Sequence, residues 1–125
     1  MSAPPLVVVD GANVVGSVPD GWWRDRFGAA ERLRDALPPV AEAGLPGIPG
    51  PVEVVLVVEG AARGVTSIPG VRVVSASGSG DDDIVALVWE ADRDCVVVTA
   101  DRGLRERVTA IGAEVAGPRA VPRRS

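Results

Sequence analysis

The sequence predicts an α/β protein, specifically a three-layer α/β/α sandwich around a mainly parallel sheet with a Rossmann-like topology. Two observations support this fold class. Short runs rich in valine show no alternation with polar residues, which is typical of strands buried on both faces beneath helices. Between these runs, apolar residues recur at helical spacing, so strands and helices alternate along the chain. Right-handed crossovers join such strands, and ligands bind beyond their carboxyl ends.

The expected elements follow in chain order. The predicted strands cover residues 6–9, 52–58, 71–74, 95–98 and, with a weaker signal, 113–116. The predicted helices cover about 22–37, 81–91 and 102–110. Five prolines interleaved with glycines fall between residues 38 and 51, and this stretch is expected to be a loop. The stretch 60–70 is ambiguous, with room for one short helical turn.

The first predicted helix contains two adjacent tryptophans with different expected environments. Asp20 precedes the helix as its predicted N-cap. Trp23 shares an apolar face with Phe27 at helical spacing, so Trp23 is expected in the core. Trp22 is expected nearer the loop after the first strand, where an indole can stack on a nucleic acid base.

Length and composition indicate one compact domain. The chain has 125 residues, of which 46% are hydrophobic, and we expect 1–125 to form a single domain with about 117–125 as a tail. No apolar run reaches the ~18 residues that cross a bilayer, and the first residues lack the pattern of a secretory signal. We therefore expect a cytoplasmic protein without membrane contact. Cys95 is the only cysteine and is expected to be a small core residue.

The composition also excludes several kinds of catalysis. The chain has no histidine and no lysine, and its 13 basic residues are all arginine. This excludes histidine acid–base catalysis, serine triads, histidine-bound zinc, Schiff bases and the P-loop lysine. The formal net charge of −4 argues against a protein that coats nucleic acid by charge alone. Any catalysis must use carboxylates, hydroxyls, arginines, backbone groups or bound metal.

Acidic residues gather where the predicted strands end. They are Asp10, Glu59, Asp81, Asp82, Asp83 and Asp101. Because parallel strands end at one edge of a sheet, we expect these carboxylates to meet. Two charges ~4 Å apart repel by about 4 kcal/mol at an effective dielectric of ~20, and divalent cations offset such repulsion. The pattern predicts a Mg²⁺ or Mn²⁺ site, in which paired ions activate water and stabilise the leaving oxygen of a phosphodiester.

Arginines are expected near the same edge, where they would contact phosphate groups. The candidates are Arg63 and Arg102, with Arg119, Arg123 and Arg124 on the tail. The net charge is −4, so neutralising five of the aspartates by metal would leave about +1. Bound metal would thereby convert an acidic edge into a surface that accepts phosphate.

Most of the acidic residues also have an ordinary structural interpretation. Carboxylates at the start of a helix serve as caps or dipole partners, which favours a structural role for Asp83 and leaves Asp101 open between capping and metal binding. Glu59, which also follows a strand, is open to the same two interpretations, a structural role or metal binding. Asp10 is the hardest to explain by packing, because it directly follows a buried strand.

Two polar residues near these acids are also open to two interpretations. Asn13 is the only asparagine and either orients Asp10 or a phosphate, or forms an Asx-turn. Thr99 either hydrogen-bonds a metal ligand or the scissile phosphate, or is a structural residue of its strand.

Three motifs together resemble a known superfamily. Asp10-Gly-Ala-Asn13, Gly78-Ser-Gly-Asp81-Asp82 and Thr99-Ala-Asp101-Arg102 are similar to motifs of the PIN-like nucleases, in particular the NYN domains of the bacterial YacP-like group. The resemblance extends from the first strand to about Arg119. It implies a PIN-like sheet with strand order 3-2-1-4-5 and the activity of a metal-dependent ribonuclease.

The resemblance also implies roles for individual residues. Asp10, Asp81 and Asp101 match the metal-binding acids, and Asp82 is a neighbour that assists or substitutes. Asn13 matches the asparagine that follows the first acid, and Thr99 matches the hydroxyl before the last.

The expected function is therefore a metal-dependent endoribonuclease that hydrolyses RNA phosphodiesters, with Asn13, Arg102, Arg63 and Arg119 contacting the RNA. The expected partner is RNA, with association to a ribosome and a homodimer both left open. Two alternatives remain. One is a non-catalytic module that binds RNA or a ribosome, and the other is a phosphohydrolase acting on nucleotides.

Overall fold

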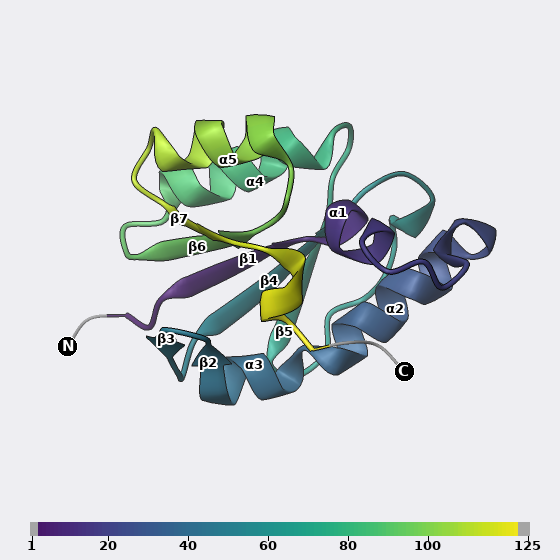
Figure 1. Ribbon diagram of the computed structural model, residues 1–125, viewed down its shortest axis with the longest axis horizontal. Helices are drawn as coiled ribbons and strands as arrows, with labels where there is room; N and C mark the ends of the chain where they lie inside the picture. Colours follow the sequence, from purple (N-terminus) through teal and green to yellow (C-terminus); the bar gives the residue numbers. More distant parts are fainter. Residues whose placement is uncertain (1–2, 123–125) are drawn as a thin grey trace.

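The computed structural model describes residues 3–122 and confirms the predicted fold class (Figure 1). The strands of its five-stranded parallel sheet are β1 (Leu6–Asp10), β4 (Glu53–Val58), β5 (Val71–Ser75), β6 (Cys95–Val98) and β7 (Glu114–Ala116). Their spatial order is β5-β4-β1-β6-β7. Numbered along the chain, this is the order 3-2-1-4-5 that the resemblance implies.

Helices cover both faces of the sheet. The α-helices are α1 (Gly11–Gly16), α2 (Arg26–Ala36), α3 (Pro38–Ala43), α4 (Gly80–Glu90) and α5 (Arg102–Thr109). Single 3₁₀ turns are η1 (Trp22–Arg24), η2 (Gly60–Ala62) and η3 (Pro118–Ala120). Figure 1 shows α4 and α5 on one side of the sheet and α2 and α3 on the other, which gives the three predicted layers.

Each face of the sheet has its own apolar core because side chains alternate along every strand. In β1, Val7 and Val9 face the first core, which is shared with α1, α2 and α3, whereas Leu6 and Val8 face the second core, which is shared with α4 and α5. Cys95 is buried in the second core, as expected. Burial on both faces explains why the strands read as nearly unbroken valine runs.

The chain direction across the sheet reverses at β1. From β1 the chain moves to β4 and β5 on one side, and α4 then carries it back to β6 on the other side of β1. The gap between the carboxyl ends of β1 and β6 is therefore the topological switch point, where ligands bind in open α/β sheets. In Figure 1 these ends lie where α1 begins.

Two predictions in the first half of the chain are wrong. Helix α2 begins at Arg26 instead of residue 22, because Asp25 caps it by accepting a hydrogen bond from the Gly28 amide at 2.9 Å; Asp20 is not its cap. Trp23 therefore lies before the helix and is 54% exposed instead of belonging to the core, while Phe27 is also exposed. The apolar face predicted for this helix therefore wrongly included residues of η1, which precedes α2.

Two further segments hold elements where none was predicted. The supposed loop 38–51 contains α3 and the hairpin of β2 (Gly44–Leu45) and β3 (Ile48–Pro49). Proline at the first helical positions costs no hydrogen bond, so these prolines begin a helix instead of preventing one. The short helix α1, absent from the prediction, directly follows β1 and buries Val14 and Val15.

The open edge of β5 is covered by the preceding segment. The Ile68 and Val71 backbones exchange two hydrogen bonds of 3.0 Å. The Ser67 hydroxyl oxygen accepts a hydrogen bond from the Val73 amide at 2.8 Å. The Val71 and Val73 amides of this edge strand thus have partners within the chain.

Two observations bear on the ends of the molecule. The described part of the segment predicted as a tail is packed, because η3 precedes Val121, which is buried in the first core. Within residues 3–122, no helix combines the length and the apolar character needed to cross a bilayer.

Candidate functional site

The centre of the candidate site is Asp10, which ends the middle strand of the sheet. The residue is only 5% exposed. One carboxylate oxygen, Oδ1, accepts a hydrogen bond from the Asn13 amide at 3.4 Å, which caps α1. The helix could form here only because Gly11 lies against β4: a Cβ at Gly11 would meet the Val57 carbonyl oxygen at 2.5 Å. Asp10 therefore has a structural role as a cap in addition to any chemical role.

Thr99 connects the ends of β1 and β6 across the switch point. It is completely buried, and its hydroxyl donates a hydrogen bond of 2.8 Å to Oδ2 of Asp10. The same hydroxyl oxygen accepts a hydrogen bond from the Asp101 amide at 3.1 Å. Arg105 donates from Nε to the Thr99 carbonyl oxygen at 2.7 Å. This network fixes the relative positions of Asp10 and Asp101, two acids 91 positions apart in the sequence.

Asn13 holds the loop after β6 against α1. Its side-chain oxygen accepts a hydrogen bond from the Ala100 amide at 2.8 Å. The sequence left open whether Asn13 orients Asp10 or a phosphate or forms an Asx-turn; this contact is a different one, which fastens the loop that carries Thr99 and Asp101. The contact joins residues 87 positions apart and is not an Asx-turn.

Three other acids lie around Asp10 at the same edge. Glu59 follows β4, and its Oε2 accepts a hydrogen bond from the Gly80 amide at 3.2 Å. Asp81 is in the first turn of α4, whose cap is the Ser79 hydroxyl. Asp101 caps α5 by accepting from the Leu104 amide at 2.9 Å. The cap that the sequence suggested for Asp101 is therefore present, whereas Asp81 is not needed for capping.

The electrostatics link these acids into one group. Burial raises the pKa of Asp10 above its usual range; the Thr99 hydroxyl and the Asn13 amide oppose the rise, and the Asp81 and Glu59 carboxylates add to it. Burial likewise raises the pKa of Asp81, with repulsion from Asp101 and Glu59 next in size. Neighbouring carboxylates thus disfavour the ionised forms of Asp10 and Asp81.

The carboxylate and hydroxyl oxygens at this edge suit a hard divalent cation, although they are not arranged around one common point. Carboxylate and hydroxyl oxygens are the preferred ligands of Mg²⁺ and Mn²⁺. In the part of the chain that the structure describes, no three acidic side chains converge closely enough to hold one ion. Asp10 is fixed by its hydrogen bonds, whereas Asp101 is exposed and Asp81 only partly buried. Asp81 thus has room to turn toward Asp10, whereas Asp101 keeps Oδ1 on the Leu104 amide and offers only Oδ2.

Other predicted residues lie farther from this centre. Asp82 is exposed and pairs with Arg107 of α5 at 3.0 Å, and Asp83 is half-buried in the same helical turn. Arg63 donates from its guanidinium to the carbonyl oxygens of Gly60 (3.2 Å) and Ser77 (3.3 Å), so it bridges η2 and the loop before α4.

The remaining predicted arginines are mostly at the surface. Arg102, the first residue of α5, and Arg119 in η3 are both exposed. Arg123 and Arg124 lie outside the described residues.

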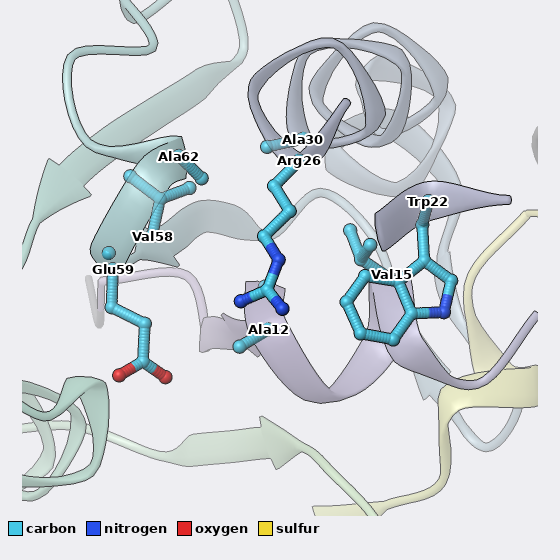
Figure 2. Close-up of a pocket in the computed structure, with 10 residues that line it drawn as sticks. Ala12, Val15, Trp22, Arg26, Ala30, Val58, Glu59 and Ala62 are labelled. Atoms are coloured by element: carbon cyan, nitrogen blue, oxygen red, sulfur yellow. The ribbon is translucent and has the colours of Figure 1, made fainter. Parts of the chain in front are cut away.

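A pocket of about 260 Å³ opens beside the acidic edge and was not predicted from the sequence. Its lining includes Gly11, Glu59, Trp22 and Arg26. Figure 2 shows the Arg26 side chain extending between Glu59 and Trp22 toward Ala12. No sequence signal singled out Arg26, because it is one of four arginines in the stretch 24–34 and the predicted start of the helix was wrong.

Comparisons with known proteins establish the fold. No protein family model matches the chain, and no curated protein matches it either. Among solved structures, the chain is similar to the crystal structure of a mutant of Rae1 (YacP) from Bacillus subtilis, with a TM-score of 0.69 and 19% sequence identity. The match covers 93% of this chain and 71% of that one. The chain therefore shares its fold with a protein of the YacP group, which its three motifs also resemble.

Proposed function

We propose that this protein is a metal-dependent ribonuclease that hydrolyses RNA phosphodiesters at the acidic edge of its sheet. One observation carries the proposal: the buried Asp10 carboxylate lies at the topological switch point, hydrogen-bonded to Thr99 and coupled electrostatically to Asp81 and Glu59. Buried carboxylates with perturbed pKa values cluster at functional sites. The resemblance of the three motifs to PIN-like nucleases supports RNA as the substrate, and the fold is shared with Rae1 (YacP).

The chain's own residues have separate roles in this proposal. Asp10, Asp81 and Asp101 hold Mg²⁺ or Mn²⁺, with Asp82 and Glu59 as neighbouring acids. Thr99 and Asn13 keep Asp10 and the loop after β6 in position through the hydrogen bonds described above. When bound, the metal lowers the pKa of a water molecule and stabilises charge on the departing oxygen. This chemistry requires neither histidine nor lysine, and the chain has neither.

Arginines complete the proposed RNA contacts. Arg63 and Arg102 lie at or next to the acidic edge. Arg119 lines a second pocket together with Ala100, which belongs to the loop after β6. Guanidinium groups bind phosphate through paired hydrogen bonds. With a net charge of −4, these few arginines orient RNA without coating it, and a ribosome is a partner that would supply further RNA contacts.

The proposal is tested by cleavage of structured and unstructured RNA with Mg²⁺ or Mn²⁺. Wild type is expected to cleave RNA, and Asp10→Asn is expected to be inactive. Asp92→Asn is the matched control, because Asp92 is exposed in the loop before β6, at the opposite edge of the sheet. Mn²⁺ should also raise the melting temperature of wild type and Asp92→Asn but not that of Asp10→Asn.

Other outcomes would select the alternatives. RNA binding without turnover, together with a melting temperature indifferent to millimolar metal, would identify a non-catalytic RNA-binding module. Hydrolysis of nucleotides but not of RNA would identify a phosphohydrolase. Equal loss of cleavage in Asp10→Asn and Asp92→Asn would show that the acidic edge is not the catalytic site.

A further inference from the structure

We propose that the pocket beside the acidic edge is a subsite for one nucleotide of single-stranded RNA, with Trp22 stacking on the base and Arg26 binding the phosphate. This inference rests on the proposed function, because it names where the substrate lies next to the reacting phosphodiester. The pocket holds about 260 Å³, which is below the usual range for drug-sized ligands and suits a single base instead of a longer segment.

Trp22 supplies a flat apolar surface inside the pocket. Its indole packs edge-on against Trp23, with ring centroids 5.9 Å apart and planes at 87°. Trp22 also packs against the first core and is only partly exposed. The ring is thus held in place before a ligand arrives, so little conformational entropy would be lost when a base stacks on it.

Arg26 supplies a positive charge that has no ion-pair partner among residues 3–122. Its guanidinium carbon lies 5.2 Å from the centroid of the Trp22 ring. Within residues 3–122, its guanidinium makes no hydrogen bond or ion pair, including none with Glu59 across the pocket. The stacking contact orients the side chain toward Ala12 (Figure 2), and all guanidinium donors remain available for a phosphate. As Arg26 turns to that phosphate, the indole face becomes free for the base.

The pocket and the acidic edge are continuous. Glu59 lines the pocket and is also one of the carboxylates that disfavour ionisation of Asp10. Gly11, another lining residue, directly follows Asp10. A nucleotide in the pocket would therefore place the neighbouring phosphodiester at the carboxylates. Stacking on an indole requires an unpaired base, so the geometry selects single-stranded RNA over a duplex.

The sequence itself provides matched controls. Trp89 is an exposed tryptophan on α4, and Arg24 is an exposed arginine two positions before Arg26. Neither lines the pocket. General effects of removing an indole or a positive charge should therefore appear in these controls as well, whereas a subsite affects only Trp22 and Arg26.

The first measurement needs no metal. In a protein carrying Trp23→Phe and Trp89→Phe, Trp22 is the remaining tryptophan, and its fluorescence is followed while a short unstructured RNA is added in EDTA. Quenching is expected with the single strand and not with the matching duplex. Trp22→Leu should lower the RNA affinity by about 5- to 150-fold, whereas Trp22→Phe, which keeps a flat ring, should lose much less.

The arginines are compared in the same binding assay. Arg26→Ala should weaken binding and reduce the slope of log affinity against log salt concentration by about the amount expected for one phosphate contact. Trp89→Leu and Arg24→Ala should stay within about twofold of wild type. In metal-dependent cleavage, the Trp22 and Arg26 variants should raise KM more than they lower kcat.

The subsite and the proposed activity can fail separately. Quenching of Trp22 by single-stranded RNA without any cleavage would uphold the subsite and refute the nuclease. Cleavage that depends on Asp10 but is indifferent to Trp22→Leu and Arg26→Ala would uphold the nuclease and refute the subsite. Equal losses in Trp22→Leu and Trp89→Leu, equal losses in Arg26→Ala and Arg24→Ala, or equal quenching by duplex would also overturn the subsite.

Discussion

Replacing Thr99 with valine should destabilise the protein strongly, although valine has nearly the same shape. Thr99 is completely buried, and its hydroxyl donates to Oδ2 of Asp10 while accepting from the Asp101 amide. A hydrogen bond to a charged group contributes about 1.5–3 kcal/mol, and leaving the partly buried Asp101 amide without its acceptor adds roughly 1 kcal/mol. We therefore expect Thr99→Val to lower the free energy of unfolding by about 2–4 kcal/mol near neutral pH, a fall in melting temperature on the order of 10 °C.

The pH dependence of this loss distinguishes the hydrogen bond from packing. Burial raises the pKa of Asp10, and the Thr99 hydroxyl counteracts the rise, so Thr99→Val should raise that pKa further. Above the pKa the ionised carboxylate lacks its donor in the variant, and the full loss applies. Below it the carboxyl is protonated in both proteins, so the loss attributable to charge disappears.

Urea unfolding of wild type, Thr99→Val and Thr99→Ser at about pH 7 and about pH 3.5 measures both effects. Thr99→Ser keeps the hydroxyl and should stay closer to wild type at neutral pH. A Thr99→Val loss below about 0.5 kcal/mol, or one of equal size at both pH values, would refute the view that this hydroxyl stabilises an ionised Asp10.

Three other substitutions test the surroundings of Asp10. Gly11→Ala should destabilise by about 1–3 kcal/mol in urea unfolding, because the new methyl meets a backbone oxygen at 2.5 Å; Gly78→Ala, with open space around it, should have little effect. Asp81→Asn should raise the free energy of unfolding of the metal-free protein near neutral pH, because the pKa of Asp81 is raised. This gain in stability should vanish in acid, where the Asp81 carboxyl of wild type is protonated. A gain of equal size at both pH values would contradict the explanation. Asn13→Ala should lower the free energy of unfolding by about 0.5–1.5 kcal/mol in urea unfolding, through loss of the bond to the Ala100 amide; Asp92→Asn, at the opposite edge of the sheet, should have little effect.

The sheet was predictable from the sequence because both of its faces are buried. Valine runs such as Val7–Val9 cannot be accommodated at a surface, and the alternation with helices leaves few topologies. The positions of the acids at one edge followed from that topology alone. The hydrogen bond between Thr99 and Asp10 is a direct result of two predicted strands lying side by side.

The parts that sequence reasoning missed depend on tertiary contacts. Helix α1 has only six residues, too short for a period to be visible, and it is stabilised by the Asp10 cap and by burial. The start of α2 depended on which of two aspartates, Asp20 or Asp25, acts as the cap, and local sequence does not distinguish them. Trp22 was predicted near the loop after the first strand, but placing Arg26 beside it required the correct start of that helix, so an error of a few residues hid the pocket.

The covered edge of β5 has a consequence for how the protein behaves at high concentration. An edge strand with open amides can pair with a second molecule and begin aggregation. Here the Val71 and Val73 amides donate to Ile68 and Ser67 of the same chain. At the other edge, β7 has only three residues and is followed by Pro118, which cannot donate to a growing ladder. Growth of the sheet by strand addition from a neighbouring molecule is thus disfavoured on both sides, and a valine-rich sequence of high β-propensity can fold without polymerising.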